Sequence, residues 1–153
     1  MELIYRASKD GATSNDFHNK CDNKGPTICL FKNEKGNIFG GYASISWDKN
    51  VGDYRSAPDS FIFSLTNIHN TQPTKFPNSI HQQYSLYFAN DYGPTFGGGF
   101  DIGINSDFMN ATHYANFPHS YQDNLGKRYS IFCGQQNNYN FKLKELEVFK
   151  LFK

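Results

Sequence analysis

The stretch that decides the fold is TICLFK at 27–32, followed after a short turn by FGGYASISW at 39–47. The first segment is a continuous apolar run, as expected of a strand that is covered on both sides. In the second segment every other residue from Phe39 to Trp47 is apolar or small, so one face of a strand would be buried. Gly36 in the intervening turn can adopt a positive φ. We therefore predict an antiparallel hairpin in which Trp47 is buried.

Further strands are predicted on both sides of this hairpin from short apolar or alternating runs, at 3–6, 61–65, 86–89, 100–104, 128–133 and 141–152. In the run at 61–65, Phe61, Phe63 and Leu65 share one face. The last run changes the parity of its apolar positions twice, which indicates bulges or burial on both faces. The polar stretches 66–84 and 107–124 are expected to be irregular surface connections.

One helix is predicted near the N-terminus. The sequence TSND at 13–16 can cap it, and Phe17 and Cys21 then lie on the same face at i, i+4 spacing. Many short strands with little helix indicate a mainly β fold, a two-sheet antiparallel β-sandwich with a few short flanking helices. No linker divides the chain, so residues 1–153 are predicted to form a single domain.

Composition excludes several classes of protein. The chain of 153 residues has 15 Lys and Arg against 14 Asp and Glu, and 17% of its residues are aromatic. Such a chain is not disordered, and its near-neutral charge argues against binding to nucleic acid or to a membrane surface. It contains no apolar run long enough for membrane insertion and no secretory signal at its N-terminus, so a cytoplasmic protein is expected. Three cysteines without a CxxC motif fit reduced thiols inside the cell.

The motifs of common active sites are absent from the sequence. The cluster Gly97-Gly98-Gly99 matches neither nucleotide-binding glycine pattern, and a strand rather than a helix is predicted after it. None of the five histidines has the spacing of a metal site, and there is no GxSxG elbow. We therefore expect no metal, no cofactor and no small-molecule substrate. Cys133, next to Gly134, is the most plausible exposed thiol and hence the most plausible redox group.

Two carboxylates are the remaining candidates for function. Glu145 and Glu147 lie two residues apart in the last predicted strand, on the same face. Paired carboxylates can act as general acid and base or bind a hard cation. They can equally pair with neighbouring lysines or contact a partner protein, and this structural or partner-binding role is the one we favour.

The order of motifs along the chain resembles that of a TLDc domain. LIYRASKDG at 3–11 resembles the opening of that domain, and FGGY at 39–42 with Trp47 continues it. GPTFGGGFDI at 93–102 is the most specific block, and ELEVF at 145–149 completes the set. The resemblance covers nearly the whole chain. Members of the family usually carry additional helical segments before the first strand, and this chain apparently lacks them.

The resemblance implies a non-catalytic protein-binding module without a cofactor. TLDc domains are associated with resistance to oxidative stress and with binding or regulation of the vacuolar-type proton ATPase, which would place the chain in the cytoplasm, at the surface of acidic organelles. It also implies that several residues are structural signatures of the fold: Gly40, Gly41, Gly97, Gly98, Gly99 and Asp101. Glu147 is the carboxylate singled out for partner binding. The alternatives are an antioxidant enzyme or scavenger that uses Cys133 or the two glutamates, and a structural component of a larger assembly.

Overall fold

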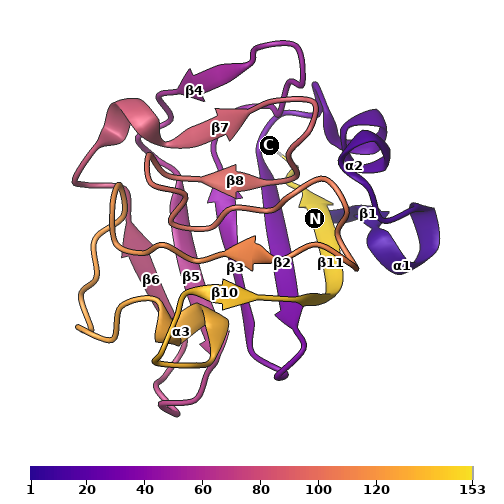
Figure 1. The fold of residues 1–153 in the computed structure, drawn as a ribbon. Helices are drawn as coiled ribbons and strands as arrows, with labels where there is room; N and C mark the ends of the chain where they lie inside the picture. Colours follow the sequence, from indigo (N-terminus) through magenta and orange to yellow (C-terminus); the bar gives the residue numbers. More distant parts are fainter. Residues whose placement is uncertain (153) are drawn as a thin grey trace.

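The computed structural model describes residues 1–152, which form a mainly β fold with antiparallel sheets and few short helices. Its largest element is a six-stranded sheet of order β1-β11-β2-β3-β5-β6 (Figure 1). The strands of this sheet are β1 (Glu2–Arg6), β2 (Thr27–Asn33), β3 (Ile38–Ala43), β5 (Phe61–Thr66), β6 (Thr74–Pro77) and β11 (Leu143–Lys150).

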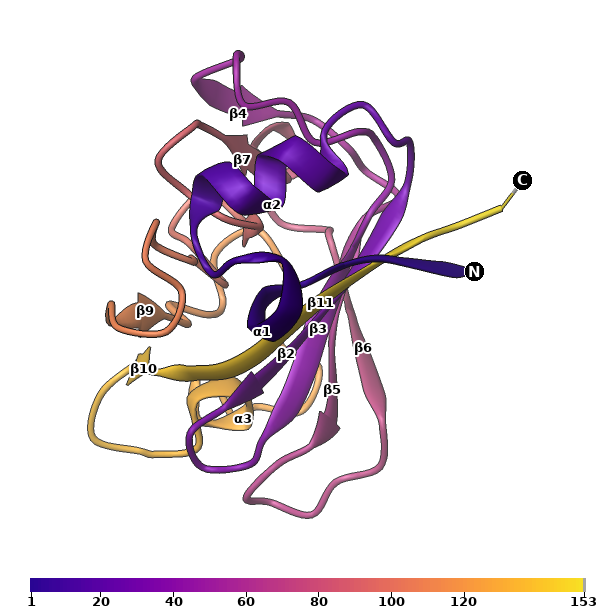
Figure 2. The same cartoon turned by 90° about the vertical axis from the view of Figure 1, so that its right-hand side faces the viewer.

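A second layer covers one face of this sheet. It contains a three-stranded sheet of order β4-β7-β8, a two-stranded sheet of β9 and β10, and the irregular chain between them. Their strands are β4 (Asp53–Arg55), β7 (Leu86–Phe88), β8 (Thr95–Phe96), β9 (His113–Tyr114) and β10 (Asn140–Phe141). Seen from the side, the two layers form a sandwich, and the other face of the six-stranded sheet has no layer over it (Figure 2).

Three short α-helices and one 3-10 turn accompany the sheets: α1 (Ala7–Asp10), α2 (Ser14–Cys21), α3 (Ser130–Cys133) and η1 (Gln82–Tyr84). Helix α2 is the predicted helix. The Thr13 side chain accepts a hydrogen bond from the Asp16 amide and so caps its N-terminus. Phe17 and Cys21 are both buried, which confirms the face that the i, i+4 spacing predicted.

The predicted hairpin is confirmed, although its second strand is shorter than expected. Strands β2 and β3 pair antiparallel from Thr27 opposite Ala43 to Lys32 opposite Ile38. Strand β3 ends at Ala43. The next amide, that of Ser44, donates its hydrogen bond to a side chain, the Ser60 hydroxyl, and not to the backbone of a neighbouring strand. Trp47 is fully buried as predicted, but it lies beyond the strand, in a bridge with Asp22.

The core of the sandwich is built around Trp47. Its ring packs against Phe17 of α2, and against Phe88 and Phe96 of the second layer, with ring centroids 5.5 to 5.7 Å apart. Its indole Nε1 donates a hydrogen bond of 3.0 Å to the Thr27 hydroxyl at the start of β2. One side chain thus joins the helix, the large sheet and the second layer.

The alternation predicted for 61–65 is present in β5, and the structure shows which of its two faces is buried. Ile62 and Ser64 of β5 are buried, whereas Phe61 and Phe63 are only half-buried. The register with β3 explains the difference, because Ile62 pairs with Gly41 on the side of the core. The three large apolar residues of β5 therefore lie on the uncovered face of the sheet.

Other boundaries also differ from the predictions. Residues 100–104 form isolated bridges, Phe96 with Ile102 and Gly103 with Tyr114, in place of a strand. The end of 128–133 is the helix α3, which Gly134 terminates in the left-handed conformation while its amide donates to the Ser130 carbonyl. The connection 66–84 includes β6 and η1.

The changes of parity at the C-terminus are explained by a bulge between Leu143 and Glu145, and by Phe149, which lies on the half-buried outer side.

None of the helices within residues 1–152 has the length and apolar character needed to span a membrane.

Replacement of Trp47 by Phe is expected to lower the free energy of unfolding by about 2–4 kcal/mol. The smaller ring leaves a cavity among Phe17, Phe88 and Phe96, and it removes the bond to Thr27. Urea denaturation followed by circular dichroism measures the loss. Tyr139→Phe, which removes a hydroxyl from a side chain that is 40% exposed, is the control and should change stability by less than about 0.5 kcal/mol. A Trp47→Phe protein as stable as this control would contradict the central role of Trp47.

Candidate functional site

One face of the six-stranded sheet is not covered by the second layer (Figure 2). Its middle is apolar, since Tyr42 and Phe61 pack their rings together at 5.2 Å and Leu65 is 40% exposed. The neighbouring strands β2 and β11 continue this face with apolar residues at one end and with Lys32, Glu145 and Glu147 at the other. A half-exposed apolar sheet face of this kind is typical of a surface that contacts another protein.

Both candidate carboxylates lie at the edge of this face. Glu145 of β11 is opposite Lys32 of β2, and Glu147 is opposite Leu30. The structure thus confirms that the two glutamates share one side of the strand. Together they border a shallow groove of about 190 Å³, lined by Leu30, Phe31, Lys32, Ile38, Glu145 and Glu147.

Each glutamate is held in place by groups from the N-terminal segment. Arg6 of β1 donates to Glu147 Oε2 through Nε at 2.8 Å and through Nη2 at 2.6 Å. Oε1 of Glu145 accepts hydrogen bonds of 3.1 Å from the backbone amides of Ser8 and Leu146. In each case one carboxylate oxygen is engaged, and the second oxygen has no hydrogen bond from any residue in 1–152.

The groove therefore combines an apolar floor with fixed charges of both signs at its rim. Arg6 and Lys32 supply the positive charges, and the two glutamates supply the negative ones. Such a rim can orient a partner through charge-assisted hydrogen bonds, while Leu30 and Ile38 receive an apolar side chain.

The glycine cluster lies in the second layer, away from the glutamates, and its main contact is with Asp101. Gly97 has a φ of +94°, and a Cβ there would collide with the Asp101 carboxylate. Asp101 is buried and accepts hydrogen bonds from the amides of His119, Ser120 and Tyr121, the shortest at 2.7 Å. Burial raises the pKa of Asp101, and these amide bonds act against the rise. The carboxylate thus ties two turns of irregular chain together.

The other glycines of the predicted signature also sit at close contacts. At Gly40 a Cβ would meet the carbonyl of Cys29 and would lie 2.7 Å from the Phe63 ring. The ring of Phe96 occupies the space over Gly41, where the two layers meet. Gly98 lies against Tyr84, and Gly99 lies against the His119 ring. The structure gives all five glycines a steric role.

The expectation that Cys133 is exposed was wrong. Cys133 is fully buried in α3, as are Cys21 and Cys29 in the core. Burial raises the pKa of the Cys133 thiol, and its sulfur lies 3.4 Å from the carbonyls of Gln135 and Asn138. Cys21 and Cys29 have their pKa raised by burial as well. A buried thiol with a raised pKa is a poor nucleophile.

Two of the histidines serve the fold. His113 is buried, and burial lowers its pKa. Its Nδ1 accepts a bond from the Asn105 amide, and its Nε2 lies 2.8 Å from the Phe108 carbonyl. His18 of α2 bonds Asp22 through Nδ1 at 2.7 Å and the carbonyl of Ala89 through Nε2 at 2.9 Å. Within residues 1–152, no three His, Cys, Asp or Glu side chains meet as metal ligands.

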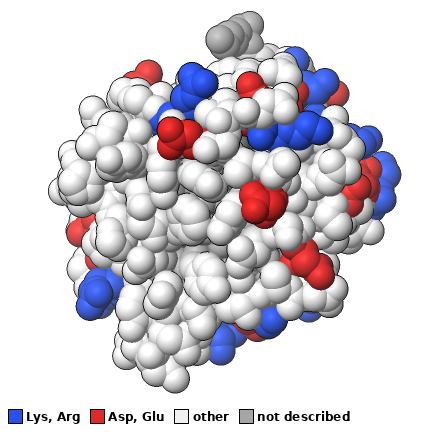
Figure 3. All heavy atoms as spheres, turned by 45° about the horizontal axis from the view of Figure 1, so that its top comes forward, with Lys and Arg blue, Asp and Glu red and all other residues white. Residues whose placement is uncertain are grey.

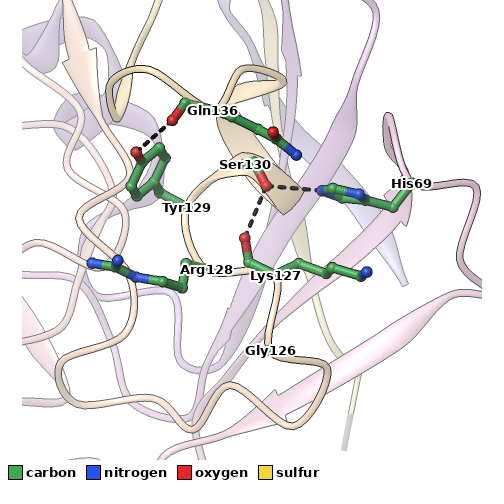
Figure 4. A pocket seen from close by; sticks show the side chains of 7 residues that line it. All are labelled: His69, Gly126, Lys127, Arg128, Tyr129, Ser130 and Gln136. Atoms are coloured by element: carbon green, nitrogen blue, oxygen red, sulfur yellow. Dashed lines mark hydrogen bonds between the residues drawn. The ribbon is translucent and has the colours of Figure 1, made fainter.

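A pairing of His69 and Ser130 was not visible in the sequence, because the tertiary fold alone brings these residues together. His69 Nε2 lies 2.8 Å from Ser130 Oγ, at a surface hollow of about 330 Å³ (Figure 4). Ser130 Oγ also lies 2.8 Å from the Lys127 carbonyl, and a hydroxyl that donates to this carbonyl accepts its bond from Nε2 of His69. In that arrangement the histidine does not take up the proton of the serine.

The sequence of this chain is similar to those of a known family. The TLDc domain family matches residues 1–152. This chain belongs to the TLDc domain family. One relative, the MTOR-associated protein MEAK7 of Danio rerio, is 30% identical over 63 residues, which are 41% of this chain. The match spans only 14% of that relative's length.

In this TLDc domain, Gly97→Ala is expected to destabilise the fold more than Gly36→Ala. Both glycines have a positive φ, +94° and +83°, which costs an alanine about 1–2 kcal/mol. Open space surrounds Gly36, whereas Asp101 fills the space at Gly97. Urea denaturation of the two variants isolates the steric part of the cost. Equal losses of stability would show that Asp101 adjusts without cost and that the close contact is unimportant.

The cysteines of the TLDc domain are expected to resist alkylation in the folded state. Because burial raises the pKa of all three thiols and covers them, N-ethylmaleimide at neutral pH should add no adduct to the native protein. In urea all three should react. Mass spectrometry of the intact chain counts the adducts. Fast labelling of Cys133 in the native state would contradict its buried position and revive a redox role.

Proposed function

We propose that this TLDc domain is a non-catalytic protein-binding module that contacts its partner through the uncovered sheet face and the Glu145/Glu147 groove. The observation that carries the proposal is the uncovered, partly apolar face beside two carboxylates that each keep an oxygen free. Binding through such a face needs complementary shape and a few anchor residues, and it needs no reactive group.

The partner we propose is the vacuolar-type proton ATPase, and the proposed role is regulation of that enzyme and resistance to oxidative stress. Membership of the TLDc domain family supports this choice, because TLDc domains are associated with binding of this ATPase and with resistance to oxidative stress. The chain would then act in the cytoplasm, at the surface of acidic organelles. The relative MEAK7 is described as MTOR-associated, which also fits a role in association with other proteins.

A direct antioxidant activity is the alternative, and the geometry gives it little support. The three thiols are buried, their pKa values are raised, and Glu147 is held by Arg6 on an open face. Peroxide turnover by the purified chain is the decisive measurement. We expect none above background, and turnover that is lost in Cys133→Ser or Glu147→Gln would replace the binding proposal by an enzymatic one.

Glu147→Gln is expected to weaken binding to the purified ATPase by about tenfold, because one charge-assisted hydrogen bond to the partner is lost while the shape is kept. The affinity is measured by surface plasmon resonance with the immobilised TLDc domain. The fold should be little affected, since an ion pair with a 42% exposed Arg6 contributes about 1 kcal/mol or less.

Two controls separate partner contact from internal pairing. Arg6→Gln removes the same ion pair but leaves the Glu147 carboxylate for the partner, so binding should be kept. Asp91→Asn removes a charge from an exposed site in the second layer and should change nothing. Equal losses in Arg6→Gln and Glu147→Gln would show that the glutamate acts only through Arg6. No binding of the unmodified domain would rule out the ATPase as its partner.

A further inference from the structure

The hollow beside His69 and Ser130 is a second concave feature of the surface. It has a volume of about 330 Å³ and lies where the loop after β5 meets the loop that leads into α3 (Figure 4). The side chains that line it are those of His69, Lys127, Arg128, Tyr129, Ser130 and Gln136, and none of them lines the glutamate groove. A role for this hollow is therefore independent of the proposed function.

The lining of the hollow carries positive charge. Lys127 and Arg128 contribute one charge each, and no Asp or Glu of residues 1–152 takes part in the lining. Neither basic side chain forms an ion pair with a carboxylate in this part of the chain. In Figure 4 the two side chains extend in opposite directions, with Ser130 between them. An anion bound between them would be attracted from both sides.

The acidic residue of the same loop, Asp123, is occupied by the backbone. Its Oδ1 accepts hydrogen bonds from the amides of Leu125 and Gly126, and its Oδ2 accepts one of 2.8 Å from the Arg128 amide. The carboxylate thus closes the loop and lies outside the lining of the hollow. With one acidic and two basic residues, the segment 123–128 keeps a net positive charge.

The backbone that carries the two basic residues is fixed before any ligand binds. Arg128 has a φ of +56°, a left-handed value that residues with a side chain rarely adopt, and its amide is held by Asp123. Ser130 Oγ lies 2.8 Å from the Lys127 carbonyl, and the Tyr129 hydroxyl donates to the Gln136 carbonyl at 2.9 Å. A site whose backbone is already ordered loses less conformational entropy on binding.

The hydrogen-bonding groups available in the hollow fit a phosphate group attached to a peptide. Lysine and arginine carry donors only, and within residues 1–152 neither the Lys127 ammonium nor the Arg128 guanidinium makes a hydrogen bond. A phosphate monoester offers three acceptor oxygens and a charge of about −2, which two positive charges balance better than they would a single carboxylate. The Gln136 side-chain amide is also unbonded in this part of the chain, and it can both donate to and accept from a peptide backbone.

We propose that this hollow binds a phosphorylated serine or threonine side chain of a partner protein. Recognition of phosphorylated peptides by fixed basic side chains is a recurring mode of binding. An anionic membrane is a less suitable partner, because it is bound by clusters of about four to eight basic residues. Only two line the hollow, and on the side drawn in Figure 3 the basic side chains are scattered, most of them next to acidic ones.

A nucleotide is the other source of the same phosphate chemistry. Its base would need an aromatic ring to stack on, and the Arg128 guanidinium already lies over the Tyr129 ring, 5.6 Å from its centroid. This contact favours the peptide, and nucleotide and membrane binding become outcomes of the test.

The test is titration of the whole chain, by isothermal calorimetry, with a short alanine peptide that contains one central phosphoserine. We expect saturable binding that is weakened about tenfold by Lys127→Gln and by Arg128→Gly, because each removes a charge-assisted hydrogen bond. Arg128→Gly also relieves the left-handed φ, so the fold should be kept. Lys144→Gln, which removes the same charge from an exposed site on β11, is the matched control and should leave the affinity unchanged.

Several results would overturn the proposal. The phosphopeptide would fail to bind the unmodified chain, or the same peptide without phosphate would bind as tightly. Equal losses of affinity in Lys127→Gln and Lys144→Gln would show attraction to overall charge instead of a site. Tighter binding of adenosine monophosphate than of the phosphopeptide would assign the hollow to a nucleotide. Sedimentation of the chain with vesicles that contain phosphoinositide, without binding of the phosphopeptide, would assign it to a membrane.

Discussion

The packing of Trp47 between the layers is the constraint on which the rest of the structure depends. Its ring is fully buried and touches the helix α2 and both strands β7 and β8, while its indole nitrogen bonds Thr27 of the large sheet. A large side chain with one polar group needs both an apolar cavity and a hydrogen-bond partner when it is buried. Here the cavity comes from three separate elements, so they must be assembled around it. The position of Phe96 over Gly41 follows from the same close approach of the layers.

This arrangement leaves the molecule with two different surfaces. The second layer covers one face of the six-stranded sheet, and the other face remains open, with Phe61, Phe63 and the glutamate groove on it. On the far side of the sandwich the second layer presents a row of aromatic rings, from Tyr84 through Tyr54 and Tyr87 to Phe100. One surface thus has fixed charges of both signs around an apolar floor, and the other is mainly aromatic.

Many of the reactive groups in the part of the chain that the structure describes serve to hold the fold together. The thiols are buried, the buried His113 and His18 bond backbone carbonyls, and Ser130 receives a bond from His69. The Asp101 carboxylate accepts hydrogen bonds from three backbone amides of a segment that lies outside the named strands. The irregular second layer depends on such side-chain bonds.

The sequence by itself determined the hairpin of β2 and β3, helix α2, and the common side of Glu145 and Glu147, because these features depend on local periodicity and capping. It also determined the family, through the order of its motifs. Only the tertiary structure decided which face of β5 is buried, since register with β3 sets that, and a shift of one residue would reverse it. The burial of Cys133, the meeting of His69 with Ser130, and the row of rings from Tyr84 to Phe100 were likewise decided by long-range packing. Contacts between residues far apart in the chain leave no periodic pattern, and for that reason local sequence could not reveal them.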